Sequence, residues 1–423
     1  MNKKISIIIT ILSISINLLA QSSDSLSNNV NTKYNKFRFG GYGELLFQNM
    51  DYGPDRYNNP KGSPKENRSY VDMPRFVFEF NYKLRKDIEL VTEIEFEHGG
   101  TGSALELEYE EMGEYEMEME KAGEVVLEQF FFKKSFYRAL SIKIGHMILP
   151  IGITNSRHMP TQFFTTIRPE GESSILPLTW HETGIAVLGN YRRWSYEIQL
   201  VNGLDANGFS SAFWIRYGKQ GIFETVKITN PAYTFSLQNK SIKNLTLQTG
   251  LYYGKSADNT AKPAKMDRID GAVSIGSFNF EYNNKIIVRG NIIYGNLSNS
   301  DEITKINKSI SKNIQYPRTP VAKNAMTYAL ELGYDILSFN KSNNKLYPFV
   351  RYEYYNSMEN VTGYVFRDTR YARQIITAGF NYFLMDGLAL KIDYSHRIID
   401  KGNYNDENTL GVALVFNTWF LNK

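Results

Sequence analysis

The chain of 423 residues contains no cysteine. This absence excludes disulfide bonds, thiolate metal ligands and catalysis by a cysteine nucleophile. Histidine is scarce as well, with five residues, and no zinc-binding or phosphate-binding spacing occurs. We therefore expect neither a metal nor a cofactor, and the basic residues are too scattered among acidic ones to indicate binding of nucleic acid.

Long apolar runs are also missing after the first 20 residues, so no later segment is predicted to cross a bilayer as a helix. The first residues carry Lys3 and Lys4, then an apolar run to Ala20, then a stretch rich in Ser and Asn. This order is typical of a secretory signal peptide, with an uncleaved membrane anchor as the alternative. We expect a signal peptide at 1–20, a disordered linker at 21–36 and one domain at 37–423.

Aromatic residues are plentiful, at 14%, and often recur at every second position. Phe76, Phe78 and Phe80, for example, alternate with polar residues that include Arg75 and Glu79. Successive side chains of a strand point to opposite faces, so such a segment has one apolar and one polar face. The pattern predicts sixteen strands, with a bulge in the fourth: 37–48, 75–84, 88–98, 126–133, 140–148, 182–190, 193–201, 232–238, 245–253, 273–282, 286–295, 326–337, 346–355, 372–384, 388–397 and 409–420.

The connections between these strands alternate between short turns and long loops. An even number of strands with this asymmetry is the signature of an up-and-down β-barrel of the bacterial outer membrane. In lipid only a closed barrel pairs every backbone group of its strands. We therefore predict an all-β, transmembrane antiparallel barrel with both termini on the periplasmic side. A water-soluble β-sandwich is the alternative, but it would show no such asymmetry.

The polar parity of the predicted strands would line the lumen. Its basic members are Arg38, Arg75, Lys143, Arg193, Arg289, Arg351, Arg373, Lys391 and Arg397. Its acidic members are Glu44, Glu79, Glu89, Glu93, Glu95, Glu97, Glu182, Glu197, Glu281, Glu331, Asp335, Glu353 and Asp393. Such a mixed wall sorts solutes by charge without a tight site, and sixteen strands enclose a lumen wide enough for an aqueous channel.

A local acidic segment stands out in this basic chain. Residues 89–128 contain fourteen glutamates and one lysine, with no aspartate or arginine, and so carry a net charge of −13. Most of these glutamates lie in 105–124, which the topology places in the second extracellular loop. A hydrated outer loop, with or without bound divalent cations, is one interpretation, and a vestibule that steers charged solutes is the other.

The third long loop, residues 149–181, is rich in apolar and aromatic residues. A loop of this length and composition is expected to fold inward against the barrel wall, where it would set the constriction. Its charged or titratable members are Arg157, His158, Arg168, Glu170 and Glu172.

This region resembles the phosphate-selective porin O and P family. In "GHMILPIGITNSRH", Gly145, Pro150 and Gly152 match the glycine, proline and glycine that precede the family's inward-folding loop. The following segments "HETGIAVLGN" and "WSYEIQLVNGL" look like the family's next two strands. The resemblance implies a sixteen-stranded porin, usually trimeric, that passes small anions along lysines and arginines. One departure is Ile148, where members often have a lysine.

The predicted function is that of an outer-membrane porin of a Gram-negative bacterium. It would let small hydrophilic solutes diffuse passively, anions such as phosphate among them, and its partners would be these solutes, outer-membrane lipids and copies of itself in a homotrimer. A surface adhesion or binding barrel with a plugged lumen is the alternative. We expect no enzyme, because Ser395 and His396 are neighbours on a strand and face opposite ways.

Overall fold

The computed structural model describes residues 35–53, 60–100, 106–108, 114–116, 124–220, 223, 226–260, 266–310, 318–339 and 344–422. The expected signal peptide, almost all of the linker and most of the Glu-rich segment 105–124 lie outside these residues. From Lys36 onward the chain forms a single unit. None of the helices in the described ranges is long and apolar enough to cross a membrane.

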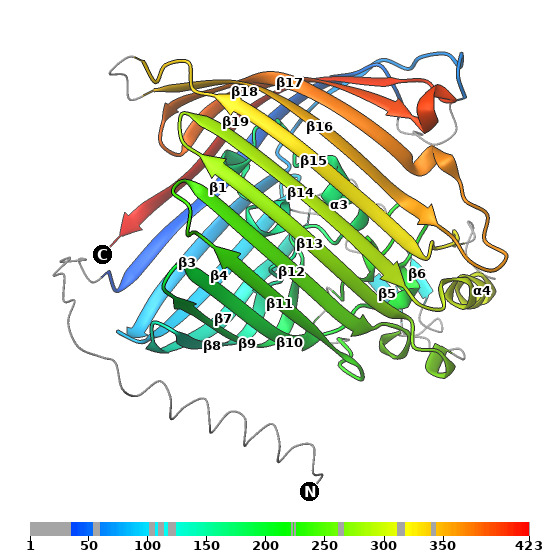
Figure 1. The fold of residues 1–423 in the computed structure, drawn as a ribbon, viewed down its shortest axis with the longest axis horizontal. Helices are drawn as coiled ribbons and strands as arrows, with labels where there is room; N and C mark the ends of the chain where they lie inside the picture. Colours follow the sequence, from blue (N-terminus) through cyan, green and yellow to red (C-terminus); the bar gives the residue numbers. More distant parts are fainter. Residues whose placement is uncertain are drawn as a thin grey trace, which may run out of the picture. The chain divides into compact units, whose positions relative to one another are not determined.

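Sixteen long strands and the short strand β2 form one antiparallel sheet (Figure 1). Their bounds are β1 (Phe37–Met50), β2 (Arg68–Asp72), β3 (Arg75–Arg85), β4 (Ile88–Glu97), β7 (Val125–Tyr137), β8 (Leu140–Ile148), β9 (His181–Tyr191), β10 (Trp194–Asn202), β11 (Pro231–Asn239), β12 (Leu245–Lys255), β13 (Ala272–Asn283), β14 (Ile286–Leu297), β15 (Asn324–Tyr334), β16 (Lys345–Asn360), β17 (Ala372–Met385), β18 (Leu388–Ile399) and β19 (Glu407–Asn422). The last strand pairs with the first, with Gly43 opposite Phe416, so the sheet closes on itself. The predicted sixteen-stranded barrel is confirmed.

The short strand β2 continues the line of β3. The lower part of β1, from Phe37 to Gly43, pairs with β3, and its upper part, from Leu46 to Met50, pairs with β2. The break between β2 and β3 contains Pro74, which has no backbone N–H to give to a ladder. β2 and β3 therefore occupy one strand position in the barrel wall.

The two ends of the barrel differ as expected. At one end, here called the short-turn end, lie connections such as 192–193, 284–285 and 386–387, together with the start of β1 and the end of β19. At the other, the long-loop end, the connections carry the helices. These are α2 (Ile153–Ser156), η1 (Pro160–Gln162), α3 (Glu170–Ile175), η2 (Ala206–Gly208), η3 (Arg216–Gly218), η5 (Ala257–Asn259), η6 (Met266–Arg268), α4 (Ser300–Ile310), η8 (Thr369–Tyr371) and η9 (Asp400–Gly402).

The described parts of the Glu-rich segment form two short strands, β5 (Glu106–Glu108) and β6 (Glu114–Glu116). They pair with each other, antiparallel, with Leu107 opposite Tyr115. The segment thus contains a small hairpin of its own. The bulge expected in the fourth predicted strand is also present, because the pairing of β4 with β7 slips between Glu93 and Ile94 and leaves Glu128 as the extra residue.

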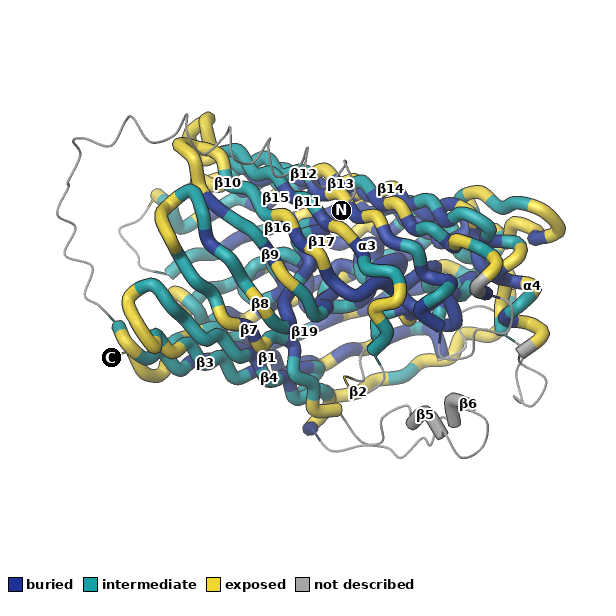
Figure 2. The backbone as a smooth tube through the Cα atoms, turned by 90° about the horizontal axis from the view of Figure 1, so that it is seen from below, coloured by how far each residue is buried: buried dark blue, intermediate teal, exposed yellow. Residues whose placement is uncertain are grey.

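The apolar parity of the strands covers the outside of the barrel. Ile292, Leu330 and Ile376 are typical, with large exposed side chains in the middle of their strands. Figure 2 shows the buried segments gathered in the half of the barrel that contains α3, while the turns at the opposite end are exposed. The outer surface is therefore apolar along the strands and polar at the short turns.

Part of the inner face is apolar too, which the alternation did not predict. Val273, Ile275 and Ile293 occupy lumen positions near the long-loop end and are buried in a cluster with Trp180 and Trp214 from the loops. The loops fold into the mouth of the barrel on this side, and their apolar side chains need apolar partners. The lumen is thus partly filled by a packed core along β10 to β15.

Candidate functional site

Residues 149–180, which we call the constriction segment, run between β8 and β9 and fold into the barrel. Leu149, Ile151 and Trp180 belong to the core in the lumen. Helix α3 of this segment packs against β15 and β16, and Figure 1 shows it behind the front wall of strands. The predicted inward folding of the third long loop is confirmed.

Glu172 holds the constriction segment together from within. Its carboxylate accepts hydrogen bonds from the backbone N–H groups of Ile153 (3.1 Å), Thr154 (3.2 Å) and Asn155 (2.8 Å) at the start of α2. A carboxylate at a helix N-terminus satisfies donors that have no partner within the helix. Burial raises the pKa of Glu172, although these N–H donors favour its charged form.

The conformation of Gly152 explains why the motif has a glycine at this position. It has a φ of 79°, a conformation that side chains disfavour, and a Cβ at this position would collide with the carboxylate of Glu172. A glycine is therefore required for Glu172 to cap α2.

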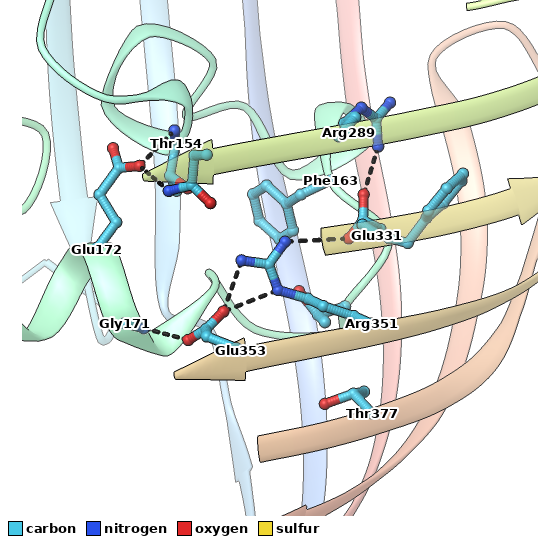
Figure 3. Close-up of polar contacts among 12 residues, drawn as sticks. Thr154, Phe163, Gly171, Glu172, Arg289, Glu331, Arg351, Glu353 and Thr377 are labelled. Carbon is cyan, nitrogen blue, oxygen red and sulfur yellow. Dashed lines mark hydrogen bonds and ion pairs between the residues drawn. The ribbon is translucent and has the colours of Figure 1, made fainter. Parts of the chain in front are cut away.

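A network of ion pairs joins the barrel wall to α3 (Figure 3). Arg289 donates to Glu331 at 2.7 Å, and Arg351 lies 3.5 Å from the other oxygen of Glu331. Arg351 also bonds Glu353 at 2.5 Å, and Glu353 in turn accepts a hydrogen bond from the backbone N–H of Gly171 in α3. Charge-assisted hydrogen bonds of this kind are stronger than neutral ones. Through Glu353 they bind the N-terminal end of α3 to the barrel wall.

The same network reaches water at the other side of the constriction segment. Arg157 pairs with Glu281, which also accepts from Arg289 at 2.9 Å. The side chain of Arg157 is 27% exposed, more than that of either partner. A pocket opens here, lined by Arg157, Arg289 and Arg351 together with Phe163 and Glu331.

A second network lies on the adjoining part of the wall, on β16 to β19. Arg397 donates to Glu170 at 2.7 Å, and Tyr355 donates to the other oxygen of Glu170, also at 2.7 Å. Arg373 bonds Glu407 at 3.3 Å and lies 3.8 Å from Glu170. Glu170 is thus the point at which these strands hold the start of α3.

Lys391 fastens the middle of the constriction segment. Its ammonium group donates to the carbonyl oxygens of Pro160 (2.5 Å), Phe163 (2.6 Å) and Thr165 (3.0 Å) and is fully buried. On the same strand, Asp393 accepts from the backbone N–H of Thr166 at 2.5 Å. These contacts come from the wall and end on the backbone of the segment, so they position it.

The remaining predicted residues are more dispersed. Arg75 bonds Glu44 at 2.9 Å and the carbonyl oxygen of His158 at 2.6 Å. Three others have partners of their own, with Arg38 stacked on Trp419, Lys143 paired with Glu197 and Arg168 donating to Thr179. The prediction that Arg193 lies in a strand and faces the lumen is wrong, because Arg193 lies exposed in the turn between β9 and β10. Turn positions follow no two-residue alternation, so parity cannot orient it.

Sequence reasoning found the charged residues of the lumen but missed how they are used. Six arginines of the lumen and the constriction segment each form an ion pair with glutamate. They are Arg75, Arg157, Arg289, Arg351, Arg373 and Arg397. It also missed Tyr355, which donates to Glu170, and the hydrogen bonds of Tyr42 with Glu93 and Glu128 on another part of the wall. Only the bulge gave a signal for Glu128, since it breaks the alternation.

No family model matches the chain. It is 26% identical, over 383 residues, to an uncharacterized protein of Aquifex aeolicus (strain VF5), and the match covers 90% of this chain and 79% of that protein. This relative is uncharacterized and only 26% identical, so it does not establish a family. The resemblance to the phosphate-selective porin O and P family therefore stays a prediction.

Solved structures decide the fold type. The chain is similar to OmpF of Salmonella typhi in complex with daunomycin, with a TM-score of 0.54 at 12% identity over 90% of this chain and 98% of that one. The barrel is of the porin type. An outer membrane channel of Acinetobacter baumannii, DcaP, gives a TM-score of 0.53 at 11% identity, covering 90% and 97% of the two chains. An anion-selective porin from Comamonas acidovorans gives 0.52 at 8% identity, covering 91% and 100%.

Proposed function

We propose that the protein is a porin of a Gram-negative outer membrane, a channel through which small hydrophilic solutes diffuse passively. The observation that carries this proposal is the constriction segment, fastened to the lumen wall beside charged side chains that reach water. Within the barrel, Arg157 is 27% exposed, Lys143 17% and Glu197 19%. A segment held in this way narrows a lumen at a fixed place.

The proposed selectivity is weak. Arg157, Arg289 and Arg351 are the positive charges at the opening, but each is paired with a glutamate. A paired charge attracts a passing ion less than a free one, because the partner's field opposes it. Anions such as phosphate would therefore pass among other solutes, because the arginines at this opening are paired with glutamates.

The proposed location and orientation in the membrane rest on the outer surface and the two ends of the barrel. Its apolar strand faces would contact outer-membrane lipids, and the short-turn end, which holds the start of β1 and the end of β19, would face the periplasm. A homotrimer is proposed from the family resemblance.

The test is a conductance measurement on purified, folded protein in planar lipid bilayers. We expect stepwise currents, with a reversal potential in a salt gradient close to that of a weakly selective pore. Arg157→Gln should shift this potential toward cation preference, whereas Lys345→Gln, at an exposed ion pair of the short-turn end, should leave it unchanged. Silence from protein that is folded and inserted would overturn the proposal and favour an adhesion barrel with a plugged lumen.

A further inference from the structure

Glu93, Glu128 and His158 meet on the inner wall of the barrel. One ligand atom from each lies within 4.8 Å of the other two, and all three residues are buried. They come from β4, from the bulge of β7 and from the constriction segment just after α2. The three residues are far apart in sequence, so no motif spacing predicts that they form a cluster.

The hydrogen bonds within the described part of the chain do not supply a donor to every carboxylate oxygen of this cluster. The hydroxyl of Tyr42 lies 2.6 Å from Glu93 Oε1 and 3.3 Å from Glu128 Oε2, but it has one hydrogen and can donate to only one of them. Glu95 Oε1 and Glu128 Oε1 are buried and accept no hydrogen bond from a donor group of the described residues, and the two carboxyl groups interact with each other. Glu95 is 4% exposed and Glu128 1%. Buried oxygens of this kind are costly unless something positive meets them.

The imidazole of His158 is oriented toward the same point. Its Nδ1 lies 3.3 Å from the carbonyl oxygen of Asn155, and its Nε2 lies 3.3 Å from Glu93 Oε1. If Nδ1–H donates to the carbonyl, Nε2 presents a lone pair to a carboxylate oxygen. A protonated imidazole makes this contact an ion pair, and a metal ion bound at Nε2 would replace it when the ring is neutral. An imidazole held through Nδ1 by a carbonyl is the usual arrangement of a metal-bound histidine.

The surrounding charges leave room for a cation. Arg75 is engaged by Glu44, and Arg168 is the basic side chain that interacts electrostatically with both Glu95 and Glu128. Beside Arg168, three carboxyl groups gather at this point, those of Glu93, Glu95 and Glu128.

We propose that Glu93, Glu128 and His158 bind a divalent transition-metal ion of the Zn²⁺ type, with Glu95 beside it. A donor set of imidazole nitrogen and carboxylate oxygens suits such ions better than Ca²⁺ or Mg²⁺, which prefer oxygen alone. The ion would join His158 of the constriction segment to β4 and β7. It would thus hold the segment on the side of the lumen that the arginine networks of β14 to β19 do not reach.

The test is a calorimetric titration of the folded full-length barrel with Zn²⁺ in detergent. We expect one ion per chain, with affinity reduced about tenfold or more in His158→Gln and in Glu128→Gln. His146→Ala is the control, because His146 bonds His181 in a separate histidine pair. Ca²⁺ and Mg²⁺ at the same concentration should not displace Zn²⁺.

The absence of saturable Zn²⁺ binding by the unmodified barrel would overturn the proposal without recourse to any variant. Binding that survives both His158→Gln and Glu128→Gln but disappears in His146→Ala would overturn it as well. A variant is compared only after its heat-modifiable mobility shows that it has folded, and Co²⁺ absorption of the unmodified chain gives a second readout. None of these measurements needs conductance, so a silent bilayer would not count against the site.

Discussion

At the scale of the residue, Lys391 shows how one side chain can hold a loop inside a barrel. It is fully buried and gives its donors to three backbone carbonyls of the constriction segment. Backbone carbonyls stay in place whatever side chains the segment carries, so the anchor depends on the path of the chain. A buried ammonium group is stable only with such partners.

We expect Lys391→Met, which keeps the length of the side chain, to lower the free energy of unfolding in urea by about 2 kcal/mol or more, since each hydrogen bond of a charged group contributes about 1.5–3 kcal/mol. It should also make residues 160–165 accessible to protease. Lys345→Met, at an exposed pair with Asp386, is the control and should change neither. Equal stability of the two variants would contradict the role given to Lys391.

Asp51, just beyond the end of β1, is predicted to make a loop contact sensitive to acid. Burial alone would raise its pKa, but the hydrogen bond and charge of Lys65 and two hydrogen bonds from Asn408 lower the pKa below the usual 3.8. A carboxyl with a lowered folded-state pKa stabilises the fold above its unfolded pKa, and this contribution is lost as pH falls through the folded value.

Asp51→Asn should therefore loosen the contact with Asn408 at neutral pH. The difference from the unmodified chain should begin to shrink near pH 3.8 and vanish only below the lowered folded-state pKa of Asp51. Backbone hydrogen exchange around Asn408, followed as a function of pH, measures this. A difference that persisted at the lowest pH would show that charge on Asp51 is not the cause.

At the scale of the element, α3 lies close to the wall because of Gly171. A Cβ at this position would lie 3.0 Å from Glu353 Oε1 and closer still to Thr327 Oγ1. The glycine lets the backbone N–H of α3 reach the carboxylate of Glu353. The position of the helix thus depends on the lack of a side chain.

We expect Gly171→Leu to push α3 away from β15 and β16 into the free part of the lumen and to reduce single-channel conductance, while the barrel still folds. Gly276→Ala on β13 is the control, because the nearest atom to its new Cβ would be Leu251 Cδ2 at 3.9 Å. An unchanged conductance in Gly171→Leu would show that α3 does not limit the passage.

At the scale of the whole molecule, the strands bury polar side chains and display apolar ones, the reverse of a water-soluble barrel. Leu330 is 52% exposed in the middle region of β15, whereas its neighbour Glu331 is buried in the ion-pair network. This arrangement is stable only where the outside meets lipid.

Leu330→Arg is expected to cost about 2–4 kcal/mol of folding free energy in lipid vesicles, the range for a basic residue near the bilayer midplane. Ile242→Arg, in the exposed turn between β11 and β12, should cost much less because its side chain stays in water. Folding titrations in urea with both variants give the comparison. Similar costs at the two positions would argue against lipid contact at Leu330.

The sequence by itself determined the barrel. Alternation in segments such as 75–84 separates an apolar face from a polar one over each strand, and the lengths of the connections distinguish the two ends, because both are local properties of consecutive residues. The inward folding of the third loop could be predicted for the same reason, from its own length and composition.

Only the tertiary structure decided what the lumen contains. Arg351 and Glu331 could be placed on the inner face, but which acid meets which base depends on strand register and on where the constriction segment lies. The bulge at Glu128 and the path to His158 bring together three residues that are distant in sequence. Contacts of this kind arise from closure of the sheet and entry of a loop, and periodicity along one strand has no information about either.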